Sequence, residues 1–410
     1  MLAARLLSDE HDIHLFEAGD YLGGHTHTVD VEVQGDQYAA DTGFMVFNDR
    51  TYPNFVRMLD LLGIPSRASD MSFSVRCDRT GLEYQGGTVF GLFAQRRNLF
   101  RPSFYRMLRD ILRFNREAPR LLDSEDESIT LDDYLRNNQY SRQFLDHYLA
   151  PMGASIWSTP PSEFRQFPAR YTVGFMQNHG LLQLRDRPQW KTIVGGAERY
   201  VEVLMRPLSD RVRLNCPVHR VQRRSNDVLV TPRNGEAEVF DSVVLAAHAD
   251  QSLAMLADPS AAEQEILGAI PYQANEVVLH TDTRLLPHAR RAWASWNYHI
   301  SDFDQQAVIL TYHLNQLQGH RSAEPILETL NPTVETDPAK VLDRMTYHHP
   351  VYSVRAINAQ RRYGEINGQR GTYYCGAYWG YGFHEDGVRS ALAVADCFGK
   401  SLETCTVAST

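Results

Sequence analysis

The sequence lacks long hydrophobic runs and has few cysteines. No stretch of about eighteen apolar residues occurs in it, which is roughly the length that a membrane-spanning helix requires. The opening MLAARLLSDEHD has too short an apolar stretch for a signal peptide. The five cysteines are scattered, odd in number and without metal-ligand spacing: Cys77, Cys216, Cys375, Cys397 and Cys405. We therefore expect reduced thiols, no metal site and a cytoplasmic protein.

Lysine is also scarce. Only Lys191, Lys340 and Lys400 occur, so arginine carries nearly all the positive charge. The formal net charge of −9 argues against a general nucleic-acid binder. With 410 residues, 43% hydrophobic and 22% charged, the chain has an ordinary globular composition and is long enough for two domains.

Strand-like and helix-like patterns alternate at both ends of the chain, and the middle differs. Residues 12–17 alternate as a strand, residues 30–41 form a hairpin with Gly35-Asp36 at its turn, and residues 52–62 form a helix. Residues 90–150 have a helical pattern rich in arginine. This arrangement predicts a discontinuous nucleotide-binding domain with a substrate domain inserted into it. The predicted parts are 1–76, 191–262 and 346–410 for the first, with 77–190 (mainly helical) and 263–345 (strands) for the second.

Two short motifs near the start of the chain suit a dinucleotide. Glu17 ends a predicted strand, where an acid accepts hydrogen bonds from ribose hydroxyls, and Gly23-Gly24-His25 follows. Asp41-Thr42-Gly43-Phe44 follows the hairpin and places a glycine beside an aromatic ring, as the wall of a flat pocket does. Ordinary turns explain either motif equally well when it is taken alone.

Two further motifs lie in the second half of the chain. Val218 and the apolar run Val243–Ala247 belong to predicted strands, and core packing alone accounts for most of their pattern. The loop from Gly376 to Gly387 contains glycines among four aromatic residues directly before a helix that begins near His384. Such a loop can lie against a planar ligand, and the helix N-terminus offers free N–H groups to an anion or a carbonyl.

Together these motifs resemble the flavin-containing amine oxidase and phytoene desaturase superfamily. LFEAGDYLGGHTHT is similar to its glutamate and double-glycine segment, DSVVLAAHA to an adenine-side strand and CGAYWGYGFHEDG to its C-terminal flavin loop. DTGFMVFNDRTYPNF, MSFSVR, APMGASIWSTP and NHGLL are similar to a bacterial amine oxidase-like branch. The resemblance implies an FAD-dependent oxidoreductase.

The resemblance also implies a role for each matching position. Glu17 would bind the adenosine ribose, and Val218 would contact adenine through its backbone. Gly23, Gly24 and His25 would line the flavin and pyrophosphate path. Thr42, Gly43 and Phe44 would lie near the isoalloxazine. The ribityl chain and the pyrimidine side of the ring would be enclosed by Gly376, Ala377, Phe383, His384 and Glu385.

The chain departs from the superfamily in two ways. The superfamily begins with a strand and a Gly-x-Gly-x-x-Gly turn, which would stand upstream of Met1. We therefore expect an α/β, FAD/NAD(P)-binding Rossmann-like fold of the glutathione reductase type without its first strand, with an inserted α+β substrate domain. We expect a chain without that phosphate-binding element to hold FAD weakly. In addition, His25 replaces the arginine usual after the two glycines.

The chemistry implied by the resemblance is hydride transfer to a non-covalent flavin. No cysteine precedes the last strand where some relatives attach flavin covalently. Relatives that oxidise amines place a lysine on substrate-domain strands and a tyrosine beside the flavin. Here Lys340 is the only lysine between Ala249 and Tyr373, and Phe383 replaces the tyrosine. We therefore expect dehydrogenation or desaturation of a hydrophobic, lipid-like or acyl-like substrate. The aromatic residues of 156–176 would either line a tunnel for this substrate or simply form the core between the domains. Amine oxidation and a catalytically inactive partner of a lipid-modifying enzyme are the alternatives.

A row of arginines in the inserted region suggests a surface contact. Arginines recur every three or four residues, and this spacing places them on one face of a helix: Arg106, Arg109, Arg113, Arg116 and Arg120. A basic amphipathic helix in an acidic protein suits peripheral contact with an anionic membrane, such as the inner membrane. A solvated face paired with the acidic run at 123–127 is the alternative.

Overall fold

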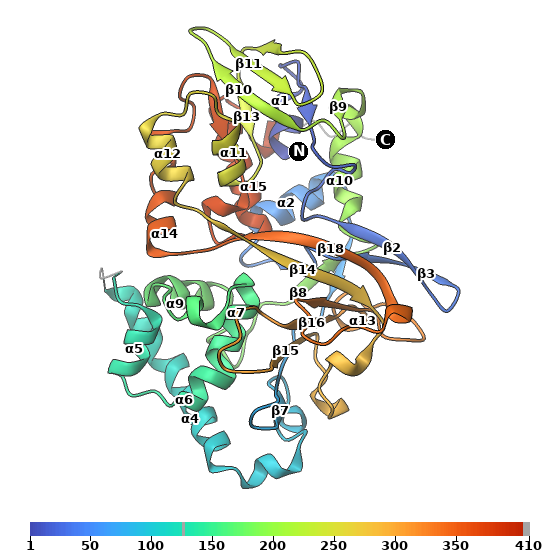
Figure 1. The fold of residues 1–410 in the computed structure, drawn as a ribbon, viewed down its shortest axis with the longest axis vertical. Helices are drawn as coiled ribbons and strands as arrows, with labels where there is room; N and C mark the ends of the chain where they lie inside the picture. Colours follow the sequence, from blue (N-terminus) through green and yellow to red (C-terminus); the bar gives the residue numbers. More distant parts are fainter. Residues whose placement is uncertain (125–127, 405–410) are drawn as a thin grey trace.

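The computed structural model describes residues 1–124 and 128–404. Its long axis runs from a small β meander at one end, through a large sheet, to a helical lobe at the other end (Figure 1). Glu125–Glu127 of the predicted acidic run and Cys405 lie outside the described residues. No helix in the described part of the chain is long and apolar enough to cross a lipid bilayer.

The large sheet has seven strands in the order β18-β14-β17-β16-β15-β6-β7. They are β6 (Phe73–Cys77), β7 (Leu82–Gln85), β14 (Tyr272–His280), β15 (Trp296–Ile300), β16 (Leu310–His313), β17 (Leu327–Leu330) and β18 (Val341–Pro350). All neighbours are antiparallel except β6 and β15. Val75, Val277, Leu279 and Leu310 lie in its buried core. The predicted boundary at residue 76 falls inside β6.

Two short pairs of parallel strands lie apart from the large sheet. β1 (Leu15–Phe16) pairs with β9 (Val212–Arg213), and β13 (Val243–Leu245) pairs with β19 (Thr372–Tyr374). The helices α1 (Leu2–Leu7), α2 (Pro53–Leu62), α10 (Glu198–Met205) and α15 (His384–Asp396) pack beside them in one hydrophobic core. Parallel strands need crossover connections, which is typical of α/β folds. The predicted mixed α/β class is therefore confirmed, and the glutathione reductase subtype stays a prediction.

The predicted hairpin is present as β2 (Thr28–Val33) and β3 (Asp36–Asp41). β5 (Ser66–Ala68), β8 (Trp190–Ile193) and β4 (Phe47–Asn48) form a three-stranded sheet beside it. The meander consists of β10 (Val218–Arg223), β11 (Val228–Pro232) and β12 (Glu238–Phe240).

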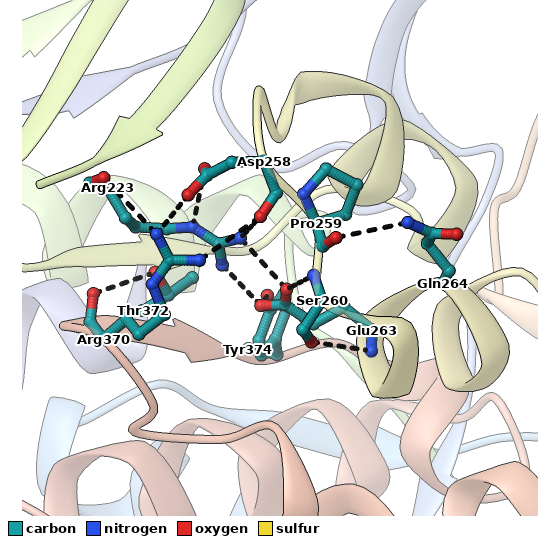
Figure 2. Close-up of polar contacts among 9 residues, drawn as sticks. All are labelled: Arg223, Asp258, Pro259, Ser260, Glu263, Gln264, Arg370, Thr372 and Tyr374. Atoms are coloured by element: carbon teal, nitrogen blue, oxygen red, sulfur yellow. Dashed lines mark hydrogen bonds and ion pairs between the residues drawn. The ribbon is translucent and has the colours of Figure 1, made fainter.

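A buried ionic network ties the meander to the parallel pairs (Figure 2). Arg223 of β10 donates to Glu263 of α12 (Ala261–Leu267), with Nη2 3.0 Å from Oε2, and to Asp258. Tyr374 at the end of β19 donates to the same Glu263 carboxylate. Because the Arg223 side chain is 0% exposed, water does not stabilise its positive charge, and the carboxylates of Glu263 and Asp258 do so instead. The network fixes where β19 ends, and the loop with the aromatic residues starts there.

The helical lobe contains α4 (Pro102–Glu117), α5 (Leu131–Asn137), α6 (Arg142–Phe144), α7 (Ala150–Trp157), α8 (Pro161–Phe164) and α9 (Ala169–Asn178). Its core is aromatic, and Trp157, Phe164, Phe167, Phe175 and Met176 are buried in one cluster. Of the two possibilities for these side chains, the structure therefore favours a packed core over the lining of a tunnel. Tyr171 lines a cavity of about 250 Å³ beside this core.

Candidate active site

The first part of the candidate site lies where β1 ends. Glu17 follows β1 directly, and its Oε1 accepts a hydrogen bond from the backbone N–H of Gly19 at 2.8 Å. The backbone oxygen of Glu17 accepts from the N–H of Cys216 at 2.8 Å, two residues before Val218 begins β10. Glu17 and Val218, both predicted at the adenosine end of a dinucleotide, therefore lie on adjacent segments.

The double glycine and the segment Thr42–Phe44 are in direct contact. The N–H of Phe44 donates to the backbone oxygen of His25 at 2.9 Å. A Cβ atom on Gly43 would lie 2.0 Å from that oxygen, so no side chain fits there. Gly23 has φ +126° and Gly24 has φ +60°, which glycine adopts without strain. Gly43 is therefore required by the close approach of the two backbones, whereas Gly23 and Gly24 are required by the backbone conformation of their turn.

The C-terminal loop meets both segments through His384. The ring of His384 stacks on Phe44 with centroids 3.4 Å apart. Its Nε2 lies 2.9 Å from the Thr26 hydroxyl and 2.8 Å from the Tyr200 hydroxyl. Burial, and to a smaller extent the neighbouring His25, lowers the pKa of His384 to about 3. A neutral imidazole at the start of α15 thus joins the two ends of the chain.

The loop before α15 is held by its own polar groups. Gly376 follows β19 closely, and its N–H donates to the Ser390 hydroxyl at 2.8 Å, while Ala377 begins a 3₁₀ turn. The Asp386 carboxylate accepts from the N–H of Tyr381 at 3.0 Å and from that of Phe383 at 3.1 Å. Burial raises the pKa of Asp386 to about 6 despite these bonds. The backbone N–H groups of this loop are therefore partly occupied within the fold.

Glu385 makes a contact that its sequence position did not suggest. Its Oε1 accepts from Asn54 Nδ2 at 2.6 Å, and its Oε2 accepts from the N–H of Phe55 at 3.0 Å. The carboxylate thus satisfies the free N–H groups at the N-terminus of α2 and complements the helix dipole. Its role against a flavin stays a prediction, and in the structure its side chain joins α15 to α2.

A group of histidines beside His25 was not identified from the sequence as part of the site. The ring centroid of His25 lies 5.4 Å from that of His349 on β18 and 6.0 Å from that of His248. His349 Nδ1 lies 3.0 Å from Asn275 Nδ2 on β14. Burial lowers the pKa of His25 to about 4 and that of His349 to about 3. The doublet His348-His349 at a strand end was the signal that could have indicated them.

Two hydroxyl groups were also not identified. The Tyr347 hydroxyl lies 2.7 Å from the Thr42 hydroxyl and 2.9 Å from His27 Nδ1. Tyr200 on α10 contacts Thr26 and His384. Both tyrosines come from elements distant in sequence, so no local pattern marks them.

These residues fit a flavin dinucleotide in several respects. The buried Nε2 of His25 has no hydrogen-bond partner among the described residues, as expected of a group that faces a ligand. The close approach of Gly43 to the His25 backbone and the N-terminus of the 13-residue helix α15 lie near this ring, and a helix N-terminus suits an anionic or carbonyl group of a ligand. Phe44 and His384 stack directly, so a flat ring would lie beside this pair and not between them. The described residues contain no group of three or more His, Cys, Asp or Glu side chains that could hold a metal ion.

The fold and this site define a flavin-dependent oxidoreductase. The sequence profile of the flavin containing amine oxidoreductases matches residues 1–397, so the chain belongs to this family. No curated protein matches the sequence.

Solved structures share the fold at low sequence identity. Cyclohexylamine oxidase from Brevibacterium oxydans is similar with a TM-score of 0.68 and 14% identity, over 97% of this chain and 96% of that one. Putrescine oxidase bound to putrescine has a TM-score of 0.67 and 14% identity, over 97% and 96%. A fatty acid isomerase from P. acnes that produces CLA has a TM-score of 0.66 and 15% identity, over 97% and 95%. These three proteins share a fold, and their names refer to different substrates.

Proposed function

We propose that the chain binds FAD without a covalent link and oxidises a hydrophobic, lipid-like or acyl-like substrate. The observation that carries the cofactor assignment is the meeting of His25 and Gly43, on the two sides of the β2–β3 hairpin, with His384 near the other end of the chain. FAD, when bound, would accept a hydride from the substrate. Glu17 would bind the ribose and Val218 the adenine, while the glycine segments would admit the rest of the dinucleotide.

The surroundings of Phe383 support an apolar substrate. Phe383 stacks on Phe175 of α9 with ring centroids 5.2 Å apart, and His179 lies 5.6 Å from Phe383. Burial lowers the pKa of His179 to about 4, so this ring is neutral at pH 7. Phe175 belongs to the packed core, so the partly buried Phe383 is the member of this group that can face a substrate, and an uncharged aromatic surface matches an acyl chain better than an ammonium group.

The position of lysine supports the same substrate class. Lys340 ends a 3₁₀ turn directly before β18, whereas His349 lies near the other end of β18. Nine residue steps along the strand separate the two, which is about 30 Å. Lys191 on β8 lies 3.7 Å from Asp49. Lys340 is therefore remote from the histidines beside the proposed flavin site.

His349 lies neutral beside the proposed flavin site. Its Nδ1 accepts a hydrogen bond from Asn275 Nδ2 at 3.0 Å, and burial keeps the ring neutral at pH 7. The neutral ring therefore carries its proton on Nε2 and can donate a hydrogen bond from there. In this proposal His349 donates to a polar atom of the cofactor or the substrate, and Asn275 orients the ring.

Amine oxidation is the second candidate. Two of the solved structures with this fold are a cyclohexylamine oxidase and a putrescine oxidase. The fatty acid isomerase of the same fold favours the lipid-like substrate instead. Fold alone does not choose between these chemistries.

Anaerobic reduction of the bound flavin separates the two candidates. We expect long-chain acyl lipids to bleach the flavin absorbance of the FAD-loaded protein, and cyclohexylamine and putrescine to leave it unchanged. Phe383→Ala should raise the KM for the lipid, whereas Leu184→Ala, a change at an exposed residue, should not. Rapid bleaching by either amine, with all lipids inert, would replace the first candidate by the second. A lipid-derived substrate also implies contact with a membrane surface, as the arginine row predicted.

A further inference from the structure

Large apolar side chains are exposed together on the segment between β7 and α4. Val89 and Phe90 on α3 (Val89–Leu92) are 70% and 82% exposed, and Phe100 at the end of a 3₁₀ turn is 85% exposed. Leu99 and Tyr105 are also exposed. We call residues 89–109 the tip. A group of exposed apolar side chains of this size marks an interaction surface.

The tip is held in place by hydrogen bonds. The Thr88 hydroxyl caps α3 by accepting from the N–H of Gly91 at 2.9 Å. The fully buried Asn98 donates to the backbone oxygen of Glu83 at 3.0 Å, and the Tyr105 hydroxyl donates to that of Leu99 at 3.1 Å. Phe90 and Phe100 are therefore exposed on an ordered segment, on either side of the buried Asn98.

The tip also concentrates positive charge. Residues 84–109 contain no acidic residue, in a chain with a net charge of −9, and they contain five arginines: Arg96, Arg97, Arg101, Arg106 and Arg109. Arg97 and Arg101 donate to the backbone oxygens of Gly81 and Thr80, so these bonds leave their charge unneutralised.

The remaining arginines of the tip are not neutralised by close ion pairs either. Within residues 1–124 and 128–404, neither Arg96 nor Arg106 makes an ion pair, and Arg109 approaches only Asp110, at 3.9 Å. In the described part of the chain, the predicted arginine row therefore has two parts: Arg106 and Arg109 make no close ion pair, whereas Arg113 and Arg116 do. Arg113 and Arg116 both pair with Glu117 at 2.9 Å. The unpaired charge therefore lies at the start of α4, next to the exposed aromatic rings.

The tip lies at one extremity of the molecule. β7 and the start of α4 are at the lower end in Figure 1, opposite the β10–β11 meander along the long axis. A flat surface can therefore reach the tip without meeting the rest of the protein.

We propose that the tip docks the protein on an anionic lipid bilayer. Phe90, Phe100, Val89 and Leu99 enter the boundary between head groups and acyl chains, and the surrounding arginines contact lipid phosphates. Exposed aromatic side chains on a segment that carries unneutralised arginines match a bilayer, which is apolar inside and anionic at its surface. This inference goes beyond the proposed oxidation chemistry and does not depend on it.

Vesicle flotation tests the proposal with the whole protein. We expect it to float with vesicles of phosphatidylcholine and phosphatidylglycerol, to stay behind with pure phosphatidylcholine, and to dissociate at high salt. Phe90→Ser with Phe100→Ser, and separately Arg96→Ser with Arg106→Ser, should each weaken binding on the order of tenfold or more. The control pairs Leu184→Ser with Val239→Ser, and Arg206→Ser with Arg233→Ser, change exposed residues elsewhere and should bind normally. Thermal melting establishes that each variant is folded.

Several outcomes would overturn the proposal. Failure of the folded wild-type protein to float with anionic vesicles would do so directly. Unchanged binding by the double phenylalanine variant would show that charge alone holds the protein on the vesicles and that the aromatic side chains do not enter the bilayer. A dimer in light scattering that the phenylalanine changes convert to a monomer, without vesicle binding, would assign the tip to a second copy of the chain. Tight binding of RNA by the arginines, without vesicle binding, would assign it to nucleic acid.

Discussion

His384 and Phe44 stack ring on ring, with centroids 3.4 Å apart, and so join the first and last parts of the chain. The stack stands on the edge of Phe55, whose ring lies 5.3 Å from each of them. Tyr200 and Thr26 fix the other side of the imidazole. The proposed flavin site therefore depends on the packing of these rings. A substitution can disrupt this packing without removing a catalytic group.

Replacing His384 tests this packing. His384→Ala removes a buried ring and should destabilise the fold by about 2–4 kcal/mol, with loss of flavin. His384→Phe keeps the ring and loses the two hydrogen bonds, so it should cost about 1 kcal/mol. Denaturant unfolding of both variants gives the two values. Equal costs for the two changes would show that the stack itself contributes little.

The same residue predicts a dependence of stability on pH. His384 titrates at about pH 3 when folded and at about 6.5 when unfolded. Below pH 6.5 the unfolded chain therefore binds a proton that the folded chain does not, and stability falls as pH falls toward 3. The slope is up to about 1.4 kcal/mol per pH unit. Asp386, with a raised pKa of about 6, acts in the opposite direction, so the difference between wild type and His384→Phe is the quantity to measure. A difference that is flat from pH 7 to pH 4 would refute the burial of this ring.

The network in Figure 2 predicts that a conservative substitution of Glu263 strongly destabilises the fold. Burial alone would raise the pKa of Glu263, but hydrogen bonds from Arg223, Tyr374 and the N–H of Ser260 lower it to about 2. Its contribution is thus complete above pH 4.5 and is lost as pH falls toward 2. Glu263→Gln should cost about 3–5 kcal/mol at pH 7, because it leaves Arg223 buried with an incomplete set of charged partners. Glu265→Gln, two residues away and exposed, should cost under about 0.5 kcal/mol. Comparable losses in the two variants would contradict the assigned network.

Glu17 tests the adenosine end of the site. Glu17→Ala should weaken FAD binding by about 1.5–3 kcal/mol, since ribose hydroxyls lose a charged acceptor. Glu32→Ala on β2 changes a similar acid in the hairpin and should have no effect. Titration of FAD against each variant measures the difference. The same affinity for Glu17→Ala and wild type would remove Glu17 from the site.

Local patterns predicted the elements better than the contacts between them. The hairpin over 30–41, the helix over 52–62 and the helix beginning near His384 all occur, because periodicity and glycine position are local signals. The predicted strand over 12–17 is only Leu15–Phe16. Strand length depends on neighbours, and the structure pairs this strand with β9 on one side only.

The partners of the site residues were beyond the reach of the sequence. Glu385 was expected at the flavin, and its carboxylate binds the start of α2, 330 positions away from Phe55. His349 and Tyr347 reach His25 and Thr42 only because β18 crosses beside the double-glycine segment. Such pairings follow from the tertiary fold, and no spacing within one segment encodes them.

A titration of FAD followed by its absorbance spectrum tests the central claim that these segments form a flavin site. The wild-type protein should shift and sharpen the flavin bands in a saturable way, even if binding is weak. Gly43→Ala should abolish the change, because its Cβ would lie 2.0 Å from the His25 backbone oxygen. Gly364→Ala, where nothing lies within 4 Å of the added Cβ, should titrate like the wild type. An FAD spectrum that the wild-type protein leaves unchanged, or a folded Gly43→Ala variant that binds FAD normally, would contradict the account.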